Sequence, residues 1–516
     1  MDRLEDMNVQ AKCCTADEAV ASISNGSTIV SGGFVGAAHP EALSAAVERR
    51  FLATGEPRDL TLVYAAGQGD GKTRGMNHFA HAGLLRRVIG GHWALAPSLG
   101  HLAMEETIEA YNFPQGVICQ LFRDIAAGRP GCLTHVGLGT FIDPDFGGGR
   151  LNKRTPVGLV EKVQLRDRDW LLYHSFPIDV AIIRATAADC HGNLSTSREA
   201  IKGEMLPIAQ AVRNSGGIVI AQVAEILDKP LIPQHVAVPG ILVDRIVLSD
   251  LAHHQQTFSE SFNDKYISPA PGFDFEETPI GLPPGPRRII ACRACDELER
   301  SSIVNLGIGM PEGIARIAAE RRMINDVTLT VESGPIGGTP AGGLSFGASE
   351  YPQAVIDQPA QFDFYDGGGL DFAALGAAQI DRQGNVNVSC FGRRVAGVGG
   401  FVNISQCARR LVFCGTFTSG DLEVSMADGQ LRIEREGRSR KFPVDVEQVS
   451  FSAAQGLARR QEVLYVTERA VFQLTPEGLV LTEIAPGIDL QRDIIAQMDF
   501  PPLLGALREM APSCFT

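Results

Sequence analysis

Short apolar, β-branched runs alternate with helical patterns in the first part of the chain. The hydrophobic spacing predicts helices over 16–23 and 40–50, and strands over 28–31 and 60–64. Strands that alternate with helices are typical of a parallel sheet in an α/β layer fold. The pattern therefore predicts an α/β protein whose sheet is mostly parallel and flanked by helices.

The same order of short motifs returns after residue 290, which indicates an internal duplication. The matched segments are 16–18 with 295–297, 29–34 with 303–309, 39–41 with 310–312, 48–50 with 320–322, 59–62 with 326–329, and 179–193 with 371–385. Since the matches keep their order, the sequence predicts two homologous α/β domains. The first copy carries roughly 75 residues that the second lacks, within 71–178, where we expect added helices.

These patterns predict three parts: an N-terminal domain over 1–265, a linker over 266–288, and a C-terminal domain over 289–516. The linker is rich in proline, which disfavours helix in the residue before it. The second copy ends in a β-rich section, where Asp428-Gly429 and Glu436-Gly437 predict hairpin turns. A late helix is expected over about 490–498.

Composition and charge exclude several classes of partner. A net charge of −14 over 516 residues argues against nucleic acid, whose phosphates need a basic face, and against anionic membranes. No apolar run is long enough for a membrane span, and the acidic start lacks the features of a signal peptide. We therefore expect a cytoplasmic protein whose cysteines are reduced.

No metal site is expected from the sequence. Cys292 and Cys295 form a single C-x-x-C without a second pair, and are interpreted as two helix thiols. His78 and His81 form an H-x-x-H without the glutamate of a zinc-protease helix, and are interpreted as solvated or core histidines.

The two copies differ in one acidic residue at the end of a strand. At the spacing that separates Asp59 from Asp326, Glu332 aligns with Ala65. Ligands of α/β folds bind at the carboxyl ends of strands, so a residue present there in one copy alone is informative. A carboxylate on a glycine-rich loop can act as a base or a nucleophile. The alternative interpretation is an ordinary surface glutamate.

Two glycine clusters are further candidates. Gly307, Ile308, Gly309 and Met310 follow a predicted strand and open a helix, as phosphate sites do, although the six-residue dinucleotide fingerprint is absent. The segment 397–401 could present backbone amides to a reacting oxygen, or could be a tight turn.

Together these segments resemble the class I coenzyme A transferases, in particular the single-chain acetate/propionate branch, over nearly the whole chain. Residues 25–40 look like the first family signature, with departures at Ser31 and Ala38. Val331-Glu332-Ser333-Gly334 looks like the catalytic Glu-x-Gly loop, and Val331 and Ser333 distinguish it from the version in ketoacid transferases. The resemblance implies the α/β fold that these transferases share with phosphosugar isomerases.

The resemblance also implies a ping-pong transfer of CoA from a short-chain acyl-CoA to a free carboxylic acid, through a glutamyl-CoA thioester on Glu332. It implies Gly399 and Gly400 as oxyanion donors and Gln68 as a residue that orients the acyl group. The CoA contacts that it implies are Gly307, Ile308, Gly309, Met310, Asn385 and Gly397. CoA would be substrate and covalent intermediate, with no metal or other cofactor, and a homo-oligomer is expected.

Two alternatives remain open at this point. An acyl-CoA hydrolase on the same scaffold would differ in letting water reach the thioester. A non-catalytic sensor of CoA or of a sugar phosphate would share the fold without needing Glu332.

Overall fold

The structure is a computed structural model that describes residues 9–271 and 281–515. The chain forms two compact units. The first contains the described residues up to Ala270 together with Val331–Asp363 and Phe391–Asn403. The second contains the described parts of Pro271–Thr330, Phe364–Cys390 and Ile404–Thr516. The first unit thus includes two segments that lie beyond the predicted 1–265 division.

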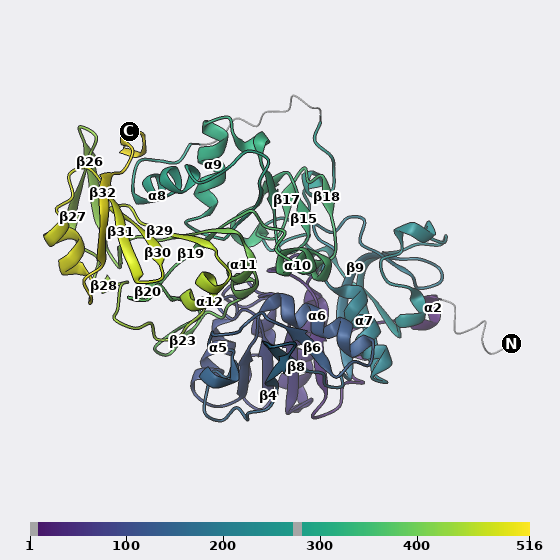
Figure 1. The fold of residues 1–516 in the computed structure, drawn as a ribbon. Coiled ribbons are helices and arrows are strands. Elements are labelled where there is room, and N and C mark those ends of the chain that lie inside the picture. The colour runs from purple at the N-terminus through teal and green to yellow at the C-terminus, as the bar shows by residue number, and fades with distance from the viewer. Residues whose placement is uncertain (1–8, 272–280, 516) are drawn as a thin grey trace. The chain divides into compact units, whose positions relative to one another are not determined.

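A parallel sheet organises the first unit, in the order β1-β12-β11-β9-β2-β3-β4-β5. Figure 1 labels two of its strands, β9 and β4. Its strands are β1 (Cys13–Cys14), β12 (Arg245–Leu248), β11 (Ile218–Ile226), β9 (Val180–Ala188), β2 (Thr28–Ser31), β3 (Leu60–Tyr64), β4 (Leu85–Gly90) and β5 (Glu109–Asn112). The short β10 (Leu194–Ser195) pairs antiparallel with β9. The prediction of a mostly parallel α/β sheet is confirmed.

Helices cover this sheet. They are α2 (Val9–Lys12), α3 (Ala16–Val20), α4 (Glu41–Thr54), α5 (Pro97–Met104), α6 (Gln115–Ala126) and α7 (Met205–Asn214). Apolar residues of α3 and α4 pack in one buried cluster with Ile29, Leu62 and Ile182 of the sheet, while α7 contacts β9 and β11. Burial of these apolar side chains is the main source of stability for such a layer.

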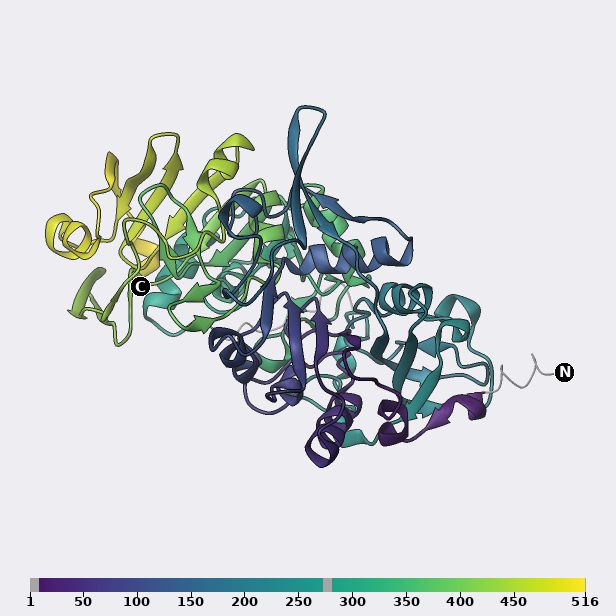
Figure 2. The ribbon, with the colours of Figure 1, turned by 90° about the horizontal axis from the view of Figure 1, so that it is seen from below.

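The segment 71–178 contains the predicted helices but also strands that were not predicted. It contributes α5 and α6, but β4 and β5 extend the main sheet in parallel to β3. Three more strands form a separate antiparallel sheet, β6 (Gly131–Thr134), β8 (Arg168–His174) and β7 (Val160–Leu165). The β7–β8 hairpin extends away from its unit (Figure 2). Two arginines inside the β4 run interrupt its apolar pattern, which explains why the strand was not predicted.

The second unit repeats this architecture. Its sheet begins with the parallel strands β14 (Thr328–Thr330), β13 (Ile303–Leu306), β19 (Phe372–Gly376), β24 (Arg410–Cys414) and β29 (Glu462–Val466). It continues through the antiparallel strands β30 (Ala470–Thr475) and β31 (Gly478–Ile484) and ends with β32 (Leu503–Glu509), all yellow in Figure 1. Helices α8 (Pro286–Cys295) and α9 (Glu312–Glu320) pack on it, and α12 (Ala453–Ala458) lies before β29.

Shorter elements complete the described chain. In the first unit, β15 (Pro335–Ile336) pairs with β18 (Ala354–Val355), and β16 (Thr339–Pro340) with β17 (Ser349–Glu350). In the second, β20 (Gln379–Ile380) pairs with β21 (Val386–Asn387), and β25 (Thr418–Ser419) with β28 (Ser439–Arg440). Other elements are β22 (Cys390–Phe391), β23 (Arg394–Val395), α10 (Gln358–Asp366) and α11 (Phe401–Cys407).

The duplication is visible in strand order and in hydrogen bonds. The order β3-β2-β9-β11-β12 in the first unit corresponds to β14-β13-β19-β24-β29 in the second. Asp179 accepts from the Thr28 amide at 2.7 Å, and its counterpart Asp371 accepts from the Ile303 amide at 3.0 Å. The two sheets therefore share connections as well as sequence motifs.

Near the C-terminus the predictions are partly correct. Asp428 and Gly429, with φ of 53° and 73°, turn the hairpin between β26 (Glu423–Ala427) and β27 (Gln430–Arg435). The hairpin predicted at Glu436-Gly437 is wrong, because β28 pairs with β25 and not with β27. The predicted late helix is one π-helical turn, Leu490–Ile494, followed by a 3-10 turn, Ile495–Gln497.

Much of the predicted linker, 272–280, lies outside the described residues, and α8 begins at Pro286, inside its predicted end. None of the helices in the described ranges has the length and apolar character to cross a membrane.

Candidate active site

Glu332 lies two residues beyond β14, on a tight turn of the first unit. The Val331 amide donates to the Pro335 carbonyl oxygen at 3.0 Å, and the Gly334 amide donates to the Val331 carbonyl oxygen at 3.0 Å. Gly334 has φ of +125°, and a Cβ there would lie 2.1 Å from the Ile356 carbonyl oxygen. Only glycine fits this position. Glu332 itself is 9% exposed, so the turn keeps the candidate nucleophile largely out of bulk solvent.

The Glu332 segment packs on the loop that follows β2. The Ser333 hydroxyl donates to the Gly347 carbonyl oxygen at 2.5 Å. A Cβ on Gly347 would lie 2.4 Å from Cδ1 of Phe34, and the Phe34 and Phe346 ring centroids are 5.5 Å apart. The first family signature and the Glu-x-Gly loop are therefore neighbours within one unit.

A third loop, after β3, packs on the loop that follows β2. The Val35 amide donates to the Gly67 carbonyl oxygen at 2.7 Å, and the Gly69 amide donates to the Val35 carbonyl oxygen at 2.9 Å. Gln68 is thereby held next to the Phe34 loop, with only 1% of its surface exposed. Its role in orienting the acyl group stays a prediction.

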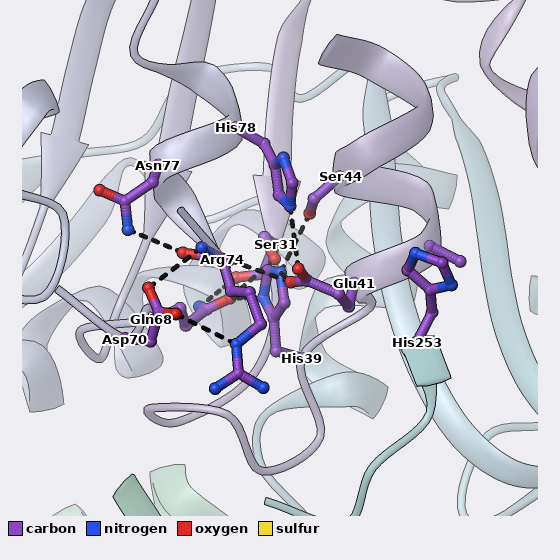
Figure 3. Close-up of polar contacts among 12 residues, drawn as sticks. Ser31, His39, Glu41, Ser44, Gln68, Asp70, Arg74, Asn77, His78 and His253 are labelled. Atoms are coloured by element: carbon purple, nitrogen blue, oxygen red, sulfur yellow. Dashed lines mark hydrogen bonds and ion pairs between the residues drawn. The ribbon is translucent and has the colours of Figure 1, made fainter. Parts of the chain in front are cut away.

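The carboxamide of Gln68 belongs to a buried polar network that the sequence did not reveal (Figure 3). Its Oε1 lies 2.9 Å from Ser31 Oγ and 2.6 Å from His39 Nδ1, and its Nε2 donates to the Ser31 carbonyl oxygen at 3.2 Å. The other ring nitrogen of His39, Nε2, is 3.4 Å from Glu41 Oε2. Ser31, one of the departures from the family signature, thus anchors both ends of the Gln68 amide.

The network continues to the H-x-x-H pair. His78 lies 2.9 Å from Glu41 and 2.5 Å from Glu48, and His81 lies 2.6 Å from Glu48. Burial opposes ionisation of Glu41, but hydrogen bonds from His39 and His78 hold its pKa well below the usual range. Burial likewise opposes the charge of His78, but Glu41 and Glu48 raise its pKa above the ordinary value. These histidines serve an ion-pair network.

The glycine cluster 397–400 is buried against the loop after β4. The Gly399 amide donates to the Gly91 carbonyl oxygen at 2.7 Å, and the Val398 amide donates to Asn112 Oδ1 at 3.1 Å. Gly399 is therefore occupied in this conformation and is not available as an oxyanion donor. The Gly400 amide has no hydrogen bond within the described ranges, which leaves it as the candidate donor.

His92 is a further residue that sequence reasoning missed. A Cβ on Gly67 would lie 2.6 Å from His92 Nδ1, and a Cβ on Gly399 would lie 3.6 Å from the Cβ of His92. Burial lowers the pKa of His92 to about 4, so the ring is neutral. This imidazole fills the space between the Gln68 loop and the glycine cluster, and a lone histidine in the sequence gave no signal of that.

The predicted CoA loop of the second unit is accessible. Ile308 is 55% exposed, and Gly309 has φ of +89° with open space where a Cβ would stand. The Gly309 carbonyl oxygen accepts from Arg287 at 2.8 Å. Gly307, Ile308, Gly309 and Met310 thus form an exposed turn between β13 and α9, at the carboxyl end of a parallel strand. Their contact with CoA stays a prediction.

The side chain of Asn385 stabilises a turn of the second unit. Its Nδ2 donates to Asp381 at 3.0 Å, and its Oδ1 accepts from the Ala453 amide at 2.9 Å. The first copy repeats the arrangement, with Asn193 donating to Asp189 at 3.0 Å. Since both copies contain this turn, the geometry gives no special reason for a CoA contact at Asn385.

Comparisons with known proteins extend this description. The sequence model of the family described as coenzyme A transferase matches residues 14–249. A caffeate CoA-transferase from Acetobacterium woodii is 42% identical, with 98% of each chain covered. The chain belongs to the coenzyme A transferase family. An acetate CoA-transferase, YdiF, from Escherichia coli (strain K12) is 39% identical, with 96% of this chain and 94% of the relative covered.

Solved structures confirm the fold of this CoA-transferase. The crystal structure of the acyl-CoA transferase YdiF apoenzyme from Escherichia coli O157:H7 matches with a TM-score of 0.92 at 38% identity, covering 98% of this chain and 96% of that one. The same protein has also been solved as a thioester complex with CoA, with the same TM-score of 0.92. The predicted family, fold class and enzyme class are confirmed.

The two thiols of the C-x-x-C pair lie in a helix of this CoA-transferase, as the sequence predicted. Cys292 and Cys295 both belong to α8 and are buried. In the described ranges, no group of three or more histidine, cysteine, aspartate or glutamate side chains is arranged to hold a metal ion.

Proposed function

We propose that this CoA-transferase moves CoA between a short-chain acyl-CoA and a free carboxylic acid, with Glu332 as the nucleophile. The observation that carries the proposal is the turn at the end of β14. It presents a mostly buried carboxylate where the first copy has Ala65, and Gly334 is required by its geometry. Since only the second copy has a glutamate at this strand end, the duplicated scaffold carries a single residue there that can form a covalent intermediate.

The reaction proceeds in two matched halves. The Glu332 carboxylate attacks the thioester carbonyl of the donor, the C–S bond breaks, and CoA leaves as a thiolate while the acyl group stays on Glu332 as a mixed anhydride. The thiolate attacks the glutamyl carbonyl and displaces the donor acid as a carboxylate, which leaves a glutamyl-CoA thioester. An acceptor carboxylate reverses both steps, so that a new acyl-CoA forms and Glu332 is regenerated.

The residue type fits this chemistry. A carboxylate can form an anhydride and then a thioester whose energy matches that of acyl-CoA, so the bond is exchanged and not lost to water. Hydrolysis is avoided only if water is excluded, and the small exposed fraction of Glu332 supports that. The Gly400 amide is the proposed donor to the oxyanion formed in each attack.

Binding of CoA away from the thioester supplies energy for the reaction. Contacts to the nucleotide and pantetheine can be used to lower the barrier at the reacting carbonyl. We propose Gly307, Ile308, Gly309, Met310 and Gly397 as CoA contacts, with the exposed turn after β13 supporting the first four. Asn385 is the weakest of these proposals because its side chain is already engaged. The proposal also includes a cytoplasmic homo-oligomer.

Short-chain acyl groups are the proposed substrates, in line with the acetate CoA-transferase relative. The caffeate CoA-transferase relative makes an aromatic acid a second candidate. Acyl exchange measured across acetate, propionate, butyrate and caffeate decides between them.

The central experiment replaces Glu332 by Gln. Turnover should be abolished while the protein stays folded, since the amide keeps the shape but cannot form the anhydride. Retention of more than a few per cent of turnover would exclude covalent catalysis at this position. In the unaltered protein, acyl-CoA without acceptor should add the mass of CoA to the peptide with Glu332, and borohydride should then convert that residue to an alcohol.

The amount of thioester that remains after the reaction distinguishes a transferase from the alternative, an acyl-CoA hydrolase. A transferase gives one new thioester for each donor consumed when a carboxylic acid is added, whereas a hydrolase loses thioester. Net loss of most of the thioester in the presence of acceptor would reject the transferase.

A further inference from the structure

His39 is a buried histidine in direct contact with the candidate site. It is 0% exposed, and its Nδ1 lies 2.6 Å from Gln68 Oε1 (Figure 3). It lies on the segment after β2 whose Phe34 packs against the Glu332 loop. Neither its burial nor its partners could be read from the sequence, because Gln68 is far from it in the chain.

The contacts of Gln68 determine which way its amide points. Oε1 can only accept, and two donors converge on it, Ser31 Oγ at 2.9 Å and His39 Nδ1. Nε2 donates one N–H to the Ser31 carbonyl oxygen at 3.2 Å. If the amide were reversed, its oxygen would face the Ser31 carbonyl oxygen, which is repulsive.

This arrangement leaves the second N–H of Gln68 without a partner in the described parts of the chain. A buried N–H without an acceptor is unfavourable, so such a group is suited to a substrate oxygen. The orientation holds only while His39 Nδ1 carries a proton directed at Gln68. The opposite ring nitrogen is 3.1 Å from Ser44 Oγ and 3.4 Å from Glu41 Oε2, which hold the ring in place.

We propose that His39 is a positioning residue for the transfer reaction, which orients the Gln68 carboxamide so that its remaining N–H faces the acyl oxygen. The inference rests on the proposed function, since it needs the acyl group to bind beside Gln68. His39 touches no reacting atom in this scheme and acts through Gln68.

The test uses two variants of nearly equal size in the full-length protein. His39→Leu removes the donor, whereas His39→Asn places an amide N–H near the position of Nδ1. We expect His39→Leu to lower kcat about tenfold and His39→Asn to recover most of that loss. His253→Leu is the matched control, because this histidine pairs with Asp250 at the surface, away from the network in Figure 3.

A double-mutant cycle distinguishes positioning from a general structural role. If His39 acts through Gln68, then His39→Leu should change kcat less than twofold in the background of Gln68→Ala. Equal fold losses in both backgrounds, or no recovery with Asn, would overturn the proposal. If His39→Leu does not fold, His39→Asn is compared with His39→Gln, whose amide lies nearer the position of Nε2, and Asn should be the more active.

The covalent intermediate separates this inference from the proposed function. CoA labelling of Glu332 should still form in the His39 variants, only more slowly. If the unaltered protein forms no label at all, the proposed function fails. If the unaltered protein forms the label but the double-mutant cycle is additive, only the positioning role of His39 is rejected, and the proposed function stands.

Discussion

Glu204, directly before α7, is a buried carboxyl group that forms no ion pair within the residues that the structure describes. It is 0% exposed, and burial raises its pKa to about 8, with the backbone amide of Gly33 opposing and the nearby Asp357 carboxylate adding to the rise. Above the unfolded pKa of 4.5 the unfolded chain releases a proton that the folded protein retains. Stability from this group is therefore lost as pH rises from 4.5 towards 8.

The size of the effect follows from the shift. At pH 7 the folded state holds this proton 2.5 pH units above the unfolded pKa, which corresponds to about 3 kcal/mol of lost stability at ~1.4 kcal/mol per unit. Glu204→Gln keeps the shape but has no proton to retain. The variant should raise the free energy of unfolding at pH 7 by up to that amount and have little effect near pH 4.5.

The assay is urea unfolding of the variant and the unaltered protein at several pH values from 5 to 8. Glu199→Gln is the matched control, since Glu199 is also buried but pairs with Arg184 at 2.9 Å. Burial opposes ionisation of Glu199, yet Arg184 and His254 lower its pKa to about 2, so its contribution is present at neutral pH and lost only in acid. The control should therefore be destabilised at pH 7. A Glu204→Gln variant no more stable than the unaltered protein at pH 8, with no trend in pH, would refute the reasoning.

Two further predictions concern single positions. Gly334→Ala should abolish transfer, because the added Cβ would lie 2.1 Å from the Ile356 carbonyl oxygen and must distort the Glu332 turn. The measurement is CoA labelling of Glu332, which should be lost while the protein still shows an unfolding transition. Full activity of the variant would contradict this prediction. Arg469→Met should lower the free energy of unfolding by about 3–5 kcal/mol in denaturant titration, because it breaks the buried ion pair between Arg469 and Glu468, two side chains that are both 0% exposed. An unchanged unfolding midpoint would show that the pair is not stabilising.

The sequence predicted best where information is local or repeated. The strands Thr28–Ser31 and Leu60–Tyr64 have the predicted ends, since a β-branched apolar run bounded by polar residues is a short-range signal. The duplication directed attention to Glu332, because a scaffold written twice exposes the position where the copies differ. Strand β4 was missed since its two arginines break the apolar run.

The remainder of the site depends on contacts that no local pattern encodes. Gly399 looked like a free amide donor, but it bonds to Gly91, a residue in the other half of the chain. The His39–Gln68 contact joins two loops through side chains that are ordinary in isolation. Asn385 shows the reverse error, since a motif that recurs in both copies signals a turn as readily as a ligand contact.

The composition of the first compact unit affects how the polypeptide can be divided. Because Val331–Asp363 and Phe391–Asn403 belong to it, a fragment that ends near residue 265 lacks part of its own unit and also lacks Glu332, the proposed nucleophile. Such a fragment, produced alone, should be poorly soluble, whereas a chain cut between 266 and 288 should regain activity when both pieces are synthesised together. We therefore expect a chain cut in that stretch to be active only when both pieces are present together.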